Sequence, residues 1–428
     1  MRRRIVVVVG LLALVAAVPE TQAGSNRPGI ADGGAVEFQN SPRAGEISAP
    51  DAISRAELED LEALAQQLSL PLDATVARYG WNADFALAID KIRDALPSAF
   101  TGAEIIDAER AWIGFTGDIP HDALSILRSF TSGRDVSVEI RSHMGFTELE
   151  LEVALETVHY SVYESEVVLD ATTSFDFESG EITTVAVLGA SVADSTLDDL
   201  RSRAISRLTD SEARGVADRF GVTVVRSRVE GLGGDDSGTL HMGGEYLGGP
   251  NTACTSGFVV LHSSIGLGVS TAGHCENQKA DDGVALLFRA QHDGTHGDFQ
   301  WHTGTQAYHR AFYSGSASAT EANKRWVEGV GTPVVGQSLC TNGISNYKTC
   351  QEVRKLNVCK GSRCNLVQMG ARLRAGGDSG GPVYWGNVAY GLHSGWQYDV
   401  FPFDRDLFSR ATRMPNAIGV SIAINSGN

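Results

Sequence analysis

All six cysteines of this chain lie between positions 254 and 364, so disulfide bonds within the chain can constrain only its C-terminal half. An even number of cysteines in an oxidising compartment is typical of a disulfide framework. Zinc-binding thiols are disfavoured because the spacings contain no paired C-x-x-C sites. The sequence leaves the connectivity open, but short separations favour Cys340–Cys350 and Cys359–Cys364, which leaves Cys254–Cys275.

The N-terminus has the pattern of an export signal. Arg2 to Arg4 precede an apolar run from Ile5 to Val18, and Thr21 to Ala23 follow it. That run is shorter than the ~20 residues that a membrane-spanning helix needs, so we expect a signal peptide at residues 1–23. No later run is long enough to span a bilayer. We therefore expect a secreted, extracellular protein without an integral membrane segment.

Charge is distributed unequally along the 428 residues. Residues 24–236 carry a net charge of −21, whereas residues 237–428 carry +2. The length exceeds one average domain, and the asymmetry suggests two units with different fates. Neither unit has the basic excess of a nucleic-acid binder, so we expect no nucleic-acid partner.

The first unit is predicted to be α+β. Residues 24–50 are rich in Gly, Ser, Pro and Ala without periodicity, which indicates a flexible leader. Over residues 51–230, helical periodicity predicts helices at 54–68, 83–96, 121–130, 148–164, 196–208 and 211–220. Alternating or short apolar runs predict strands at 111–115, 136–140, 175–177, 182–187 and 222–225.

Residues 231–244 are dominated by glycine and predict an exposed, cleavable linker. Beyond it, from residue 245, short apolar runs alternate with glycine turns, which favours a β-sandwich or barrel. These runs predict strands at 258–261, 299–301, 383–385 and 388–391. A helix is expected at 404–412, and a last strand at 417–423.

Two short blocks carry the chemistry: Thr271 to Cys275 (TAGHC) and Gly377 to Pro382 (GDSGGP). Hydrolysis of an amide at neutral pH needs an activated nucleophile and a base with a pKa near 7. Ser379 and His274 fit these roles. The surrounding glycines let the amides of Gly377 and Ser379 turn toward one point, where they can stabilise an oxyanion.

The serine block also fits the G-x-S-x-G nucleophile elbow of α/β-hydrolases. That fold orders its residues as Ser, Asp and then His, but the only histidine after Ser379 is His393. Too little chain separates the two for the remaining strands and helices of that fold. The observed order, with His274 before the aspartate and Ser379 last, is that of the chymotrypsin template.

Four aspartates follow His274 closely enough to orient it: Asp281, Asp282, Asp293 and Asp298. Asp298 is favoured because the alternating residues after it predict a half-buried strand that would hold its carboxylate rigidly. Histidines 292, 296 and 302 lie near this aspartate. Only 292 and 296 have the i, i+4 spacing of zinc peptidases, and the residues between them, 293–295, indicate a turn rather than a helix. We therefore expect neither a metal nor a cofactor.

From about residue 240 onward the chain resembles the chymotrypsin-like serine peptidases, in particular their streptogrisin and α-lytic branch. The resemblance rests on the two blocks, on Cys254 to Phe258 (CTSGF) and on Gly391 to Gly395 (GLHSG). It implies an all-β, double six-stranded barrel over residues 245–428, with the triad between the barrels. It also supports the pairs Cys254–Cys275 and Cys340–Cys350.

The resemblance further implies that residues 24–236 are a propeptide, with its α+β part at 51–230. Propeptides of this branch act as folding catalysts and inhibitors of their own enzyme. The function hypothesis is accordingly a secreted serine endopeptidase, made as a zymogen, that acts as a monomer on proteins and peptides. The alternative is a catalytically silent relative that binds peptides or another partner through the same cleft.

The resemblance also suggests residues that contact the substrate. It places Leu373 at the base of the primary pocket, where a trypsin-like enzyme has an acidic residue, so trypsin-like specificity is not expected. Ser394 and Gly395 should hydrogen-bond an extended substrate through their backbones. Trp396 replaces a small residue and should narrow the pocket. His393 stands where glutamate-preferring relatives have a pocket histidine, although a packed structural histidine also fits.

Overall fold

The computed structural model describes residues 36–38, 53–189, 192–193, 195–226, 244–249, 253–281, 284–305, 307–315, 323–398 and 404–425. The expected signal peptide lies outside these residues. So do the expected leader at 24–50, apart from 36–38, and the expected linker at 231–244, apart from Gly244. Within the described ranges, no helix has the length and apolar character needed to cross a membrane.

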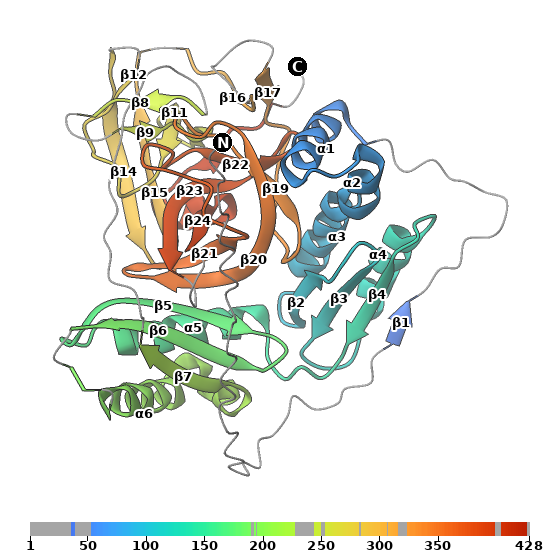
Figure 1. Ribbon diagram of the computed structural model, residues 1–428, viewed down its shortest axis with the longest axis vertical. Coiled ribbons are helices and arrows are strands. Elements are labelled where there is room, and N and C mark those ends of the chain that lie inside the picture. Colours follow the sequence, from blue (N-terminus) through green and yellow to red (C-terminus); the bar gives the residue numbers. More distant parts are fainter. Residues whose placement is uncertain are drawn as a thin grey trace, which may run out of the picture.

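The N-terminal half begins with three helices and a four-stranded sheet (Figure 1). The sheet has the order β1-β4-β3-β2, in which β3 and β4 are parallel and β2 and β3 form a hairpin. Two of these elements, α2 and β2, were not expected, and β1 lies within the expected leader. The elements are α1 (Arg55–Leu68), α2 (Leu72–Tyr79), α3 (Asn82–Ala95), α4 (His121–Thr131), β1 (Val36–Phe38), β2 (Phe100–Ile105), β3 (Arg110–Phe115) and β4 (Ser137–Arg141).

A second α+β unit repeats this order of elements: a helix, a hairpin, a crossover helix and a parallel strand. Its strands pair in the order β5-β6-β7, with β6 and β7 parallel. The helix expected at 211–220 is a 3₁₀ helix, η1, whose first turn is capped by the Ser211 hydroxyl. The elements are α5 (Glu148–Tyr163), β5 (Val168–Asp176), β6 (Glu181–Leu188), α6 (Ser195–Asp210), η1 (Glu212–Arg219) and β7 (Gly221–Arg226).

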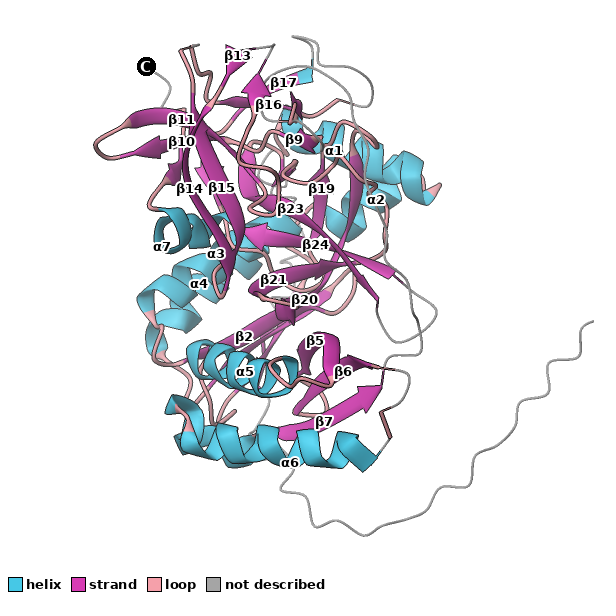
Figure 2. Ribbon diagram, turned by 90° about the vertical axis from the view of Figure 1, so that its left-hand side faces the viewer, coloured by secondary structure: helices cyan, strands magenta, loops and turns pink. Residues whose placement is uncertain are grey.

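The C-terminal half contains two β-sheet units (Figure 2). The first has five strands in the order β14-β15-β11-β10-β25 within the described residues, rather than the six expected. Its strands are β10 (Val259–His262), β11 (Gly266–Thr271), β14 (Leu287–Gly294), β15 (Gly297–Thr303) and β25 (Ser421–Ile422). Short pairs surround it: β8 (Tyr246–Leu247) with β9 (Cys254–Thr255), β12 (Ala280–Asp281) with β13 (Val284–Ala285), and β16 (Ala311–Tyr313) with β17 (Lys324–Trp326).

The second unit is a closed ring of six strands in the order β19-β22-β23-β24-β21-β20, because β20 also pairs with β19. A short parallel strand, β18 (Gly329–Val330), adds to β23. The ring comprises β19 (Ser338–Thr341), β20 (Thr349–Lys360), β21 (Arg363–Met369), β22 (Pro382–Trp385), β23 (Val388–Tyr398) and β24 (Asp404–Arg410).

Of two sequence predictions near the C-terminus, one is wrong and the other is confirmed only in part. The helix expected at 404–412 is strand β24, because β21 and β23 lie on either side and supply its hydrogen bonds. The strand expected at 417–423 is present only in part: residues 417 and 418 end helix α7 (Met414–Ile418), and the short strand β25 (Ser421–Ile422) lies within the expected range. Pro415 at the start of α7 and Gly419, left-handed at its end (φ 72°), are helix-boundary signals.

The two halves share one sheet and one core. Strand β5 pairs with the end of β20, so the ring continues into β6 and β7 of the N-terminal half (Figure 1). Helix α1 contributes Leu61 and Leu64 to the same buried cluster as Val353 and Tyr384. A continuous sheet and a shared apolar core together indicate that the halves bind each other specifically.

Buried ionic clusters cross the same junction. Asp60 of α1 is fully buried and pairs with Arg325 at 2.8 Å and with Lys348 at 2.6 Å. Glu152 of α5 similarly accepts hydrogen bonds from Arg410 and Arg413. In each cluster the N-terminal half supplies the carboxylate and the C-terminal half two cations. Two acidic residues of the first half therefore have specific partners in the second.

Candidate active site

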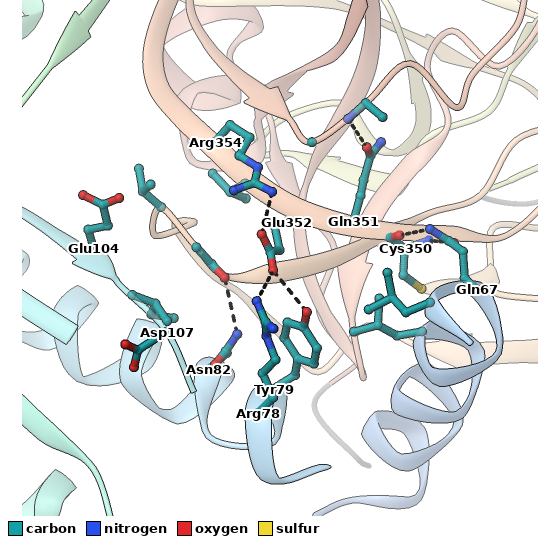
Figure 3. Close-up of a pocket in the computed structure, with 18 of the residues that line it drawn as sticks. Gln67, Arg78, Tyr79, Asn82, Glu104, Asp107, Cys350, Gln351, Glu352 and Arg354 are labelled. Carbon is teal, nitrogen blue, oxygen red and sulfur yellow. Dashed lines mark hydrogen bonds and ion pairs between the residues drawn. The ribbon is translucent and has the colours of Figure 1, made fainter. Parts of the chain in front are cut away.

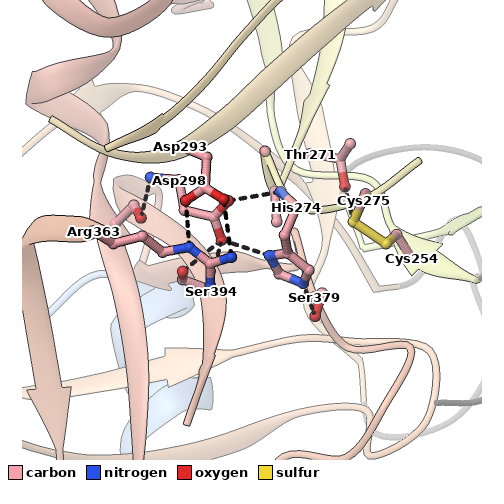
Figure 4. A network of polar contacts seen from close by, with 12 residues as sticks. Cys254, Thr271, His274, Cys275, Asp293, Asp298, Arg363, Ser379 and Ser394 are labelled. Carbon is pink, nitrogen blue, oxygen red and sulfur yellow. Dashed lines mark hydrogen bonds and ion pairs between the residues drawn. A yellow bond between two sulfur atoms is a disulfide. The ribbon is translucent and has the colours of Figure 1, made fainter. Parts of the chain in front are cut away.

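Three side chains that are distant in sequence form a hydrogen-bonded chain at the boundary of the two C-terminal β-units (Figure 4). His274 Nδ1 lies 2.6 Å from Asp298 Oδ2, and His274 Nε2 lies 2.9 Å from Ser379 Oγ. An ionised carboxylate can only accept, so the Nδ1 proton points to Asp298 and Nε2 is left to accept the serine proton. The structure thus brings together the three residues that we expected to act as a triad.

The local backbone explains why His274 meets Asp298. β11 ends at Thr271, which pairs with Gln300 on β15, so the next turn passes directly over the start of β15. A Cβ at Gly273 would lie 2.5 Å from the His292 carbonyl oxygen and 2.9 Å from Asp298 Oδ1, so only glycine permits this approach.

Further contacts fix the turn that carries His274. The His274 amide donates to Asp298 Oδ1 at 2.8 Å. The Gln300 side-chain amide donates to the carbonyls of Ala272 and Cys275, on either side of the histidine. The disulfide between Cys254 and Cys275 then ties the turn to β9.

All six cysteines are paired in the structure, and the pairs are those expected: Cys254–Cys275, Cys340–Cys350 and Cys359–Cys364. The last pair closes the hairpin between β20 and β21, next to the candidate site. It joins residues separated by only 5 positions.

Asp298 is completely buried and fully used as an acceptor. In addition to the His274 ring, the Ser394 hydroxyl donates to Asp298 Oδ2 at 2.6 Å. The Arg363 guanidinium lies 3.6 Å from the same oxygen. Burial alone would raise the pKa of this carboxyl, but His274, Arg363 and the hydrogen bonds hold it well below its ordinary range. The carboxylate therefore stays charged at neutral pH.

Asp293, one of the alternative aspartates, does not contact His274. Both of its oxygens accept from the Arg363 guanidinium. Asp281 lies in β12 and Asp282 lies outside the described residues. Of the nearby histidines, His292 accepts a hydrogen bond from the His296 amide, and His302 contacts Gln300.

The backbone before Ser379 is arranged as an oxyanion site requires. The Gly376 carbonyl accepts from the Ser345 hydroxyl at 2.7 Å, which turns the N–H of the next residue, Gly377, in the opposite direction. Gly377 has a φ of 92°, a conformation that favours glycine. Within the described residues, no acceptor is bonded to the amides of Gly377 or Ser379. These two donors are available to a ligand.

Two other residues hold this loop in place. Thr255 donates its hydroxyl to the Gly377 carbonyl and its amide to the Ser379 carbonyl, each at 2.7 Å. The buried carboxylate of Asp378 accepts from the amides of Ser345 and Ala375. Sequence reasoning missed Thr255, Ser345 and the role of Asp378, because their partners lie far along the chain.

A cavity of about 390 Å³ lies beside Ser379. His393, Ser394, Gly395 and Trp396, the expected substrate-binding residues of β23, all line it. Further lining residues are Ala253, Cys254, His274, Cys275, Lys360, Arg363, Leu366, Ala375, Gly376, Gly377 and Leu407.

Leu373, expected at the base of this pocket, lines a different cavity. Its amide donates to the Asp406 carboxylate at 2.7 Å. The side chain lines the larger cavity between α1–α3 and β20. Figure 3 shows that cavity, where Arg78 and Tyr79 of α2 contact Glu352 across the junction.

His393 and Trp396 have different environments. His393 is buried, and burial together with the nearby Arg374 lowers its pKa to about 3, so its ring is neutral. A neutral buried ring fits a structural histidine better than an anion-binding one. Trp396 is half-buried, and the Arg372 guanidinium lies 3.8 Å from the centre of its ring. This stacking holds the indole at the side of the cavity.

Comparison with solved structures finds chymotrypsin-like serine proteases, several of them bacterial. In particular, a glutamic acid specific serine protease, described as using a histidine triad in substrate binding, matches with 23% identity and a TM-score of 0.37. Thermobifida fusca Protease A matches with 21% identity, and the Nocardiopsis protease NAPase with 20%, both with a TM-score of 0.36.

These alignments cover 43%, 43% and 42% of this chain, and 100%, 98% and 97% of the respective structures. No protein-family model and no curated protein matches the sequence. At such identities and scores the similarities carry no argument about activity, which has to come from the side-chain geometry.

Proposed function

We propose that this chain is the zymogen of a secreted serine endopeptidase. The observation that carries the proposal is the bonded chain from Asp298 through His274 to Ser379, beside the two available amides of Gly377 and Ser379. Nucleophile, base, orienting carboxylate and oxyanion donors converge on one point of a cavity, as amide hydrolysis requires.

The geometry supports a two-stage reaction. Ser379 Oγ attacks the substrate carbonyl carbon while His274 Nε2 accepts the serine proton, and the carbonyl oxygen takes the negative charge between the two amides. His274 then donates that proton to the leaving nitrogen as the C–N bond breaks, which leaves an acyl-enzyme. Water, deprotonated by His274, attacks the ester and releases the acid together with Ser379. Asp298 stabilises the imidazolium in both stages.

The N-terminal half is proposed to be a propeptide that assists folding and inhibits the enzyme. The shared sheet, the shared core and the acidic groups buried against Arg325, Lys348, Arg410 and Arg413 support this. A β-ring made of distant strands is slow to assemble, because loop-closure entropy is lost before the contacts form. A partner that already supplies β5 beside β20 lowers that barrier.

Export and extracellular location are likewise part of the proposal. Three disulfides and the export pattern of residues 1–23 support it. We propose protein and peptide substrates, with Ser394 and Gly395 pairing with their backbone and without trypsin-like preference, and a monomeric mature enzyme.

The test is Ser379→Ala in the full chain. We expect peptide hydrolysis to fall by several orders of magnitude and the precursor to stay uncleaved, since the nucleophile is lost. Ser421→Ala, an exposed serine on β25, is the matched control and should keep full activity. If the chain is instead a catalytically silent peptide-binding relative, the wild type, Ser379→Ala and Ser421→Ala should all show the same low hydrolysis and should all still bind peptides.

A further inference from the structure

Two cationic side chains line the cavity beside Ser379. Lys360 and Arg363 both line it, and among the described residues no aspartate or glutamate does. Both belong to the β20–β21 hairpin, where they pair with each other and are enclosed by the Cys359–Cys364 disulfide. Disulfide and strand pairing hold these two side chains next to the candidate active site.

The two cations differ in their partners. The acidic partners of Arg363 both belong to the C-terminal half: the two carboxylate oxygens of Asp293 accept hydrogen bonds from it, and Asp298 lies 3.6 Å away. Lys360 instead pairs with Asp170 of β5, at 2.6 Å. Within the described residues, Asp170 is the only carboxylate bonded to this ammonium group. Lys360 therefore depends on the N-terminal half for its counter-charge.

The N-terminal half also fixes the tip of this hairpin. His159 of α5 donates from Nε2 to the Gly361 carbonyl at 2.8 Å, and the Tyr160 hydroxyl donates to the Ser362 carbonyl at 2.7 Å. The pKa of His159 is lowered to about 4 by burial, so its ring is neutral and Nε2 carries the proton toward that carbonyl. Asp170 is held against Lys360 by these contacts.

Separation of the halves removes Asp170 but leaves the disulfide-closed hairpin. Lys360, which lines the cavity, then loses the carboxylate that its ammonium contacts in the precursor. An ammonium group beside a cavity wall gains more from a carboxylate than a fully hydrated one does, because less water competes for it. The position that Asp170 leaves is open to an anion.

We propose that Lys360 of the separated protease binds an acidic side chain of the substrate, in the place that Asp170 occupies in the precursor. The inference rests on the proposed function and names its substrate class. Figure 4 shows Arg363 on the Asp298 and Ser394 side of His274, opposite the Cys254–Cys275 disulfide. Since the acyl part of the substrate is proposed to lie along Ser394 and Gly395, the acidic residue precedes the scissile bond.

The experiment compares peptide pairs that differ only in charge. Peptides carrying Asp or Asn, and Glu or Gln, at each position before the scissile bond are given to the processed, secreted protein. At one position we expect kcat/KM for the acid to exceed that for the amide by about five- to tenfold, the value of one partly buried ion pair. Rising salt should reduce this ratio.

Variants in the β20–β21 hairpin test whether Lys360 causes the preference for acidic peptides. Lys360→Gln should bring the acid-to-amide ratio to about one while neutral peptides are still cleaved. Lys355→Gln is the control: Lys355 also lies on β20 and contacts Ser174 of β5, but it lines a different cavity, so the ratio should stay at the wild-type value. Lys360→Glu, combined with Asp170→Lys to keep the precursor contact, should favour lysine at the same position.

The outcomes separate the inference from the function on which it rests. An acid-to-amide ratio that Lys360→Gln leaves unchanged, or a wild-type ratio near one at every position, overturns the inference while hydrolysis of neutral peptides still supports a protease. Absence of hydrolysis of every peptide by the wild-type processed protein overturns the proposed function itself.

Discussion

Replacing Asp60 by Asn tests whether buried charge binds the N-terminal helices to the C-terminal half. The Asp60 carboxylate accepts from Arg325 Nη1 at 2.8 and 2.9 Å and from the Gly386 amide at 2.7 Å. The Lys348 ammonium lies 2.6 Å away. Asparagine keeps the shape of the side chain but removes its charge, which leaves two nearly inaccessible cations.

The magnitude follows from this burial. Removing one partner of a buried ion pair costs about 3–5 kcal/mol, because the remaining charge is desolvated without compensation. Glu59 also contacts Arg325, at 3.1 Å, and offsets part of the loss. We therefore expect a free-energy loss at the lower end of this range, about 3 kcal/mol. This loss corresponds to roughly hundredfold weaker binding of the N-terminal segment to the processed protease.

The assay uses two readouts. Precursors that also carry Ser379→Ala, and so remain uncleaved, are unfolded in urea, and residues 24–236 are titrated in trans against the processed protease. Glu62→Gln, an exposed carboxylate on the same helix, is the control and should change stability by less than about 0.5 kcal/mol. If Asp60→Asn behaves like Glu62→Gln in both readouts, buried charge does not hold the halves together.

Three further predictions concern catalysis, pH and folding. Asp298→Asn should lower kcat by ~10⁴, as in the chymotrypsin template, because it no longer orients His274; an unchanged steady-state rate would move that role to another aspartate. Burial, together with the nearby charge of Glu152, raises the pKa of Glu156 to about 7. The folded precursor therefore binds a proton at Glu156 more tightly than the unfolded chain does, and it should lose stability as pH rises from about 4.5 to 7. Glu156→Gln should remove this dependence of stability on pH. Above pH 7, where the partly exposed Glu156 carboxylate is charged, the variant should be about 1 kcal/mol more stable than the wild type. Thermal unfolding at several pH values tests this, and an equal pH dependence for both proteins contradicts it. Residues 237–428 refolded alone should regain activity slowly, and residues 24–236 added in trans should speed refolding and then inhibit hydrolysis; full activity within minutes, unaffected by the added segment, is the contrary result.

The sequence predicted those elements whose signals are local. Helices α1 and α5 begin at capping boxes, Ser54 with Glu57 and Thr147 with Glu150, which can be read from neighbouring residues. Strand β24 could not be predicted in this way. Its charged start at Asp404 resembles a helical first turn, and its strand character comes from β21 and β23 on either side. Tertiary pairing overrides local propensity there.

The same distinction holds for the candidate site. His274 and Ser379 stand in blocks whose residue types already define their chemistry. Asp298 could be chosen because a strand was predicted after it; the structure places it inside β15, and this strand is buried throughout rather than half-buried as expected. The residues that surround Asp298 were not predictable. Arg363 and Ser394 reach it from strands that only the folded barrel brings near, and no sequence spacing marks those contacts.

If the N-terminal half is released as proposed, the pairing of β5 with β20 makes that release run in one direction. When the halves separate, β20 keeps its partners in the ring, but β5 loses its outer neighbour and becomes the unpaired edge of a small three-stranded sheet. Exposed strand edges are starting points for aggregation and for proteolytic attack. The released N-terminal segment is therefore the shorter-lived product. Under the proposed function, cleavage of this segment by the processed protease would prevent rebinding, so that a reversible association becomes a permanent release.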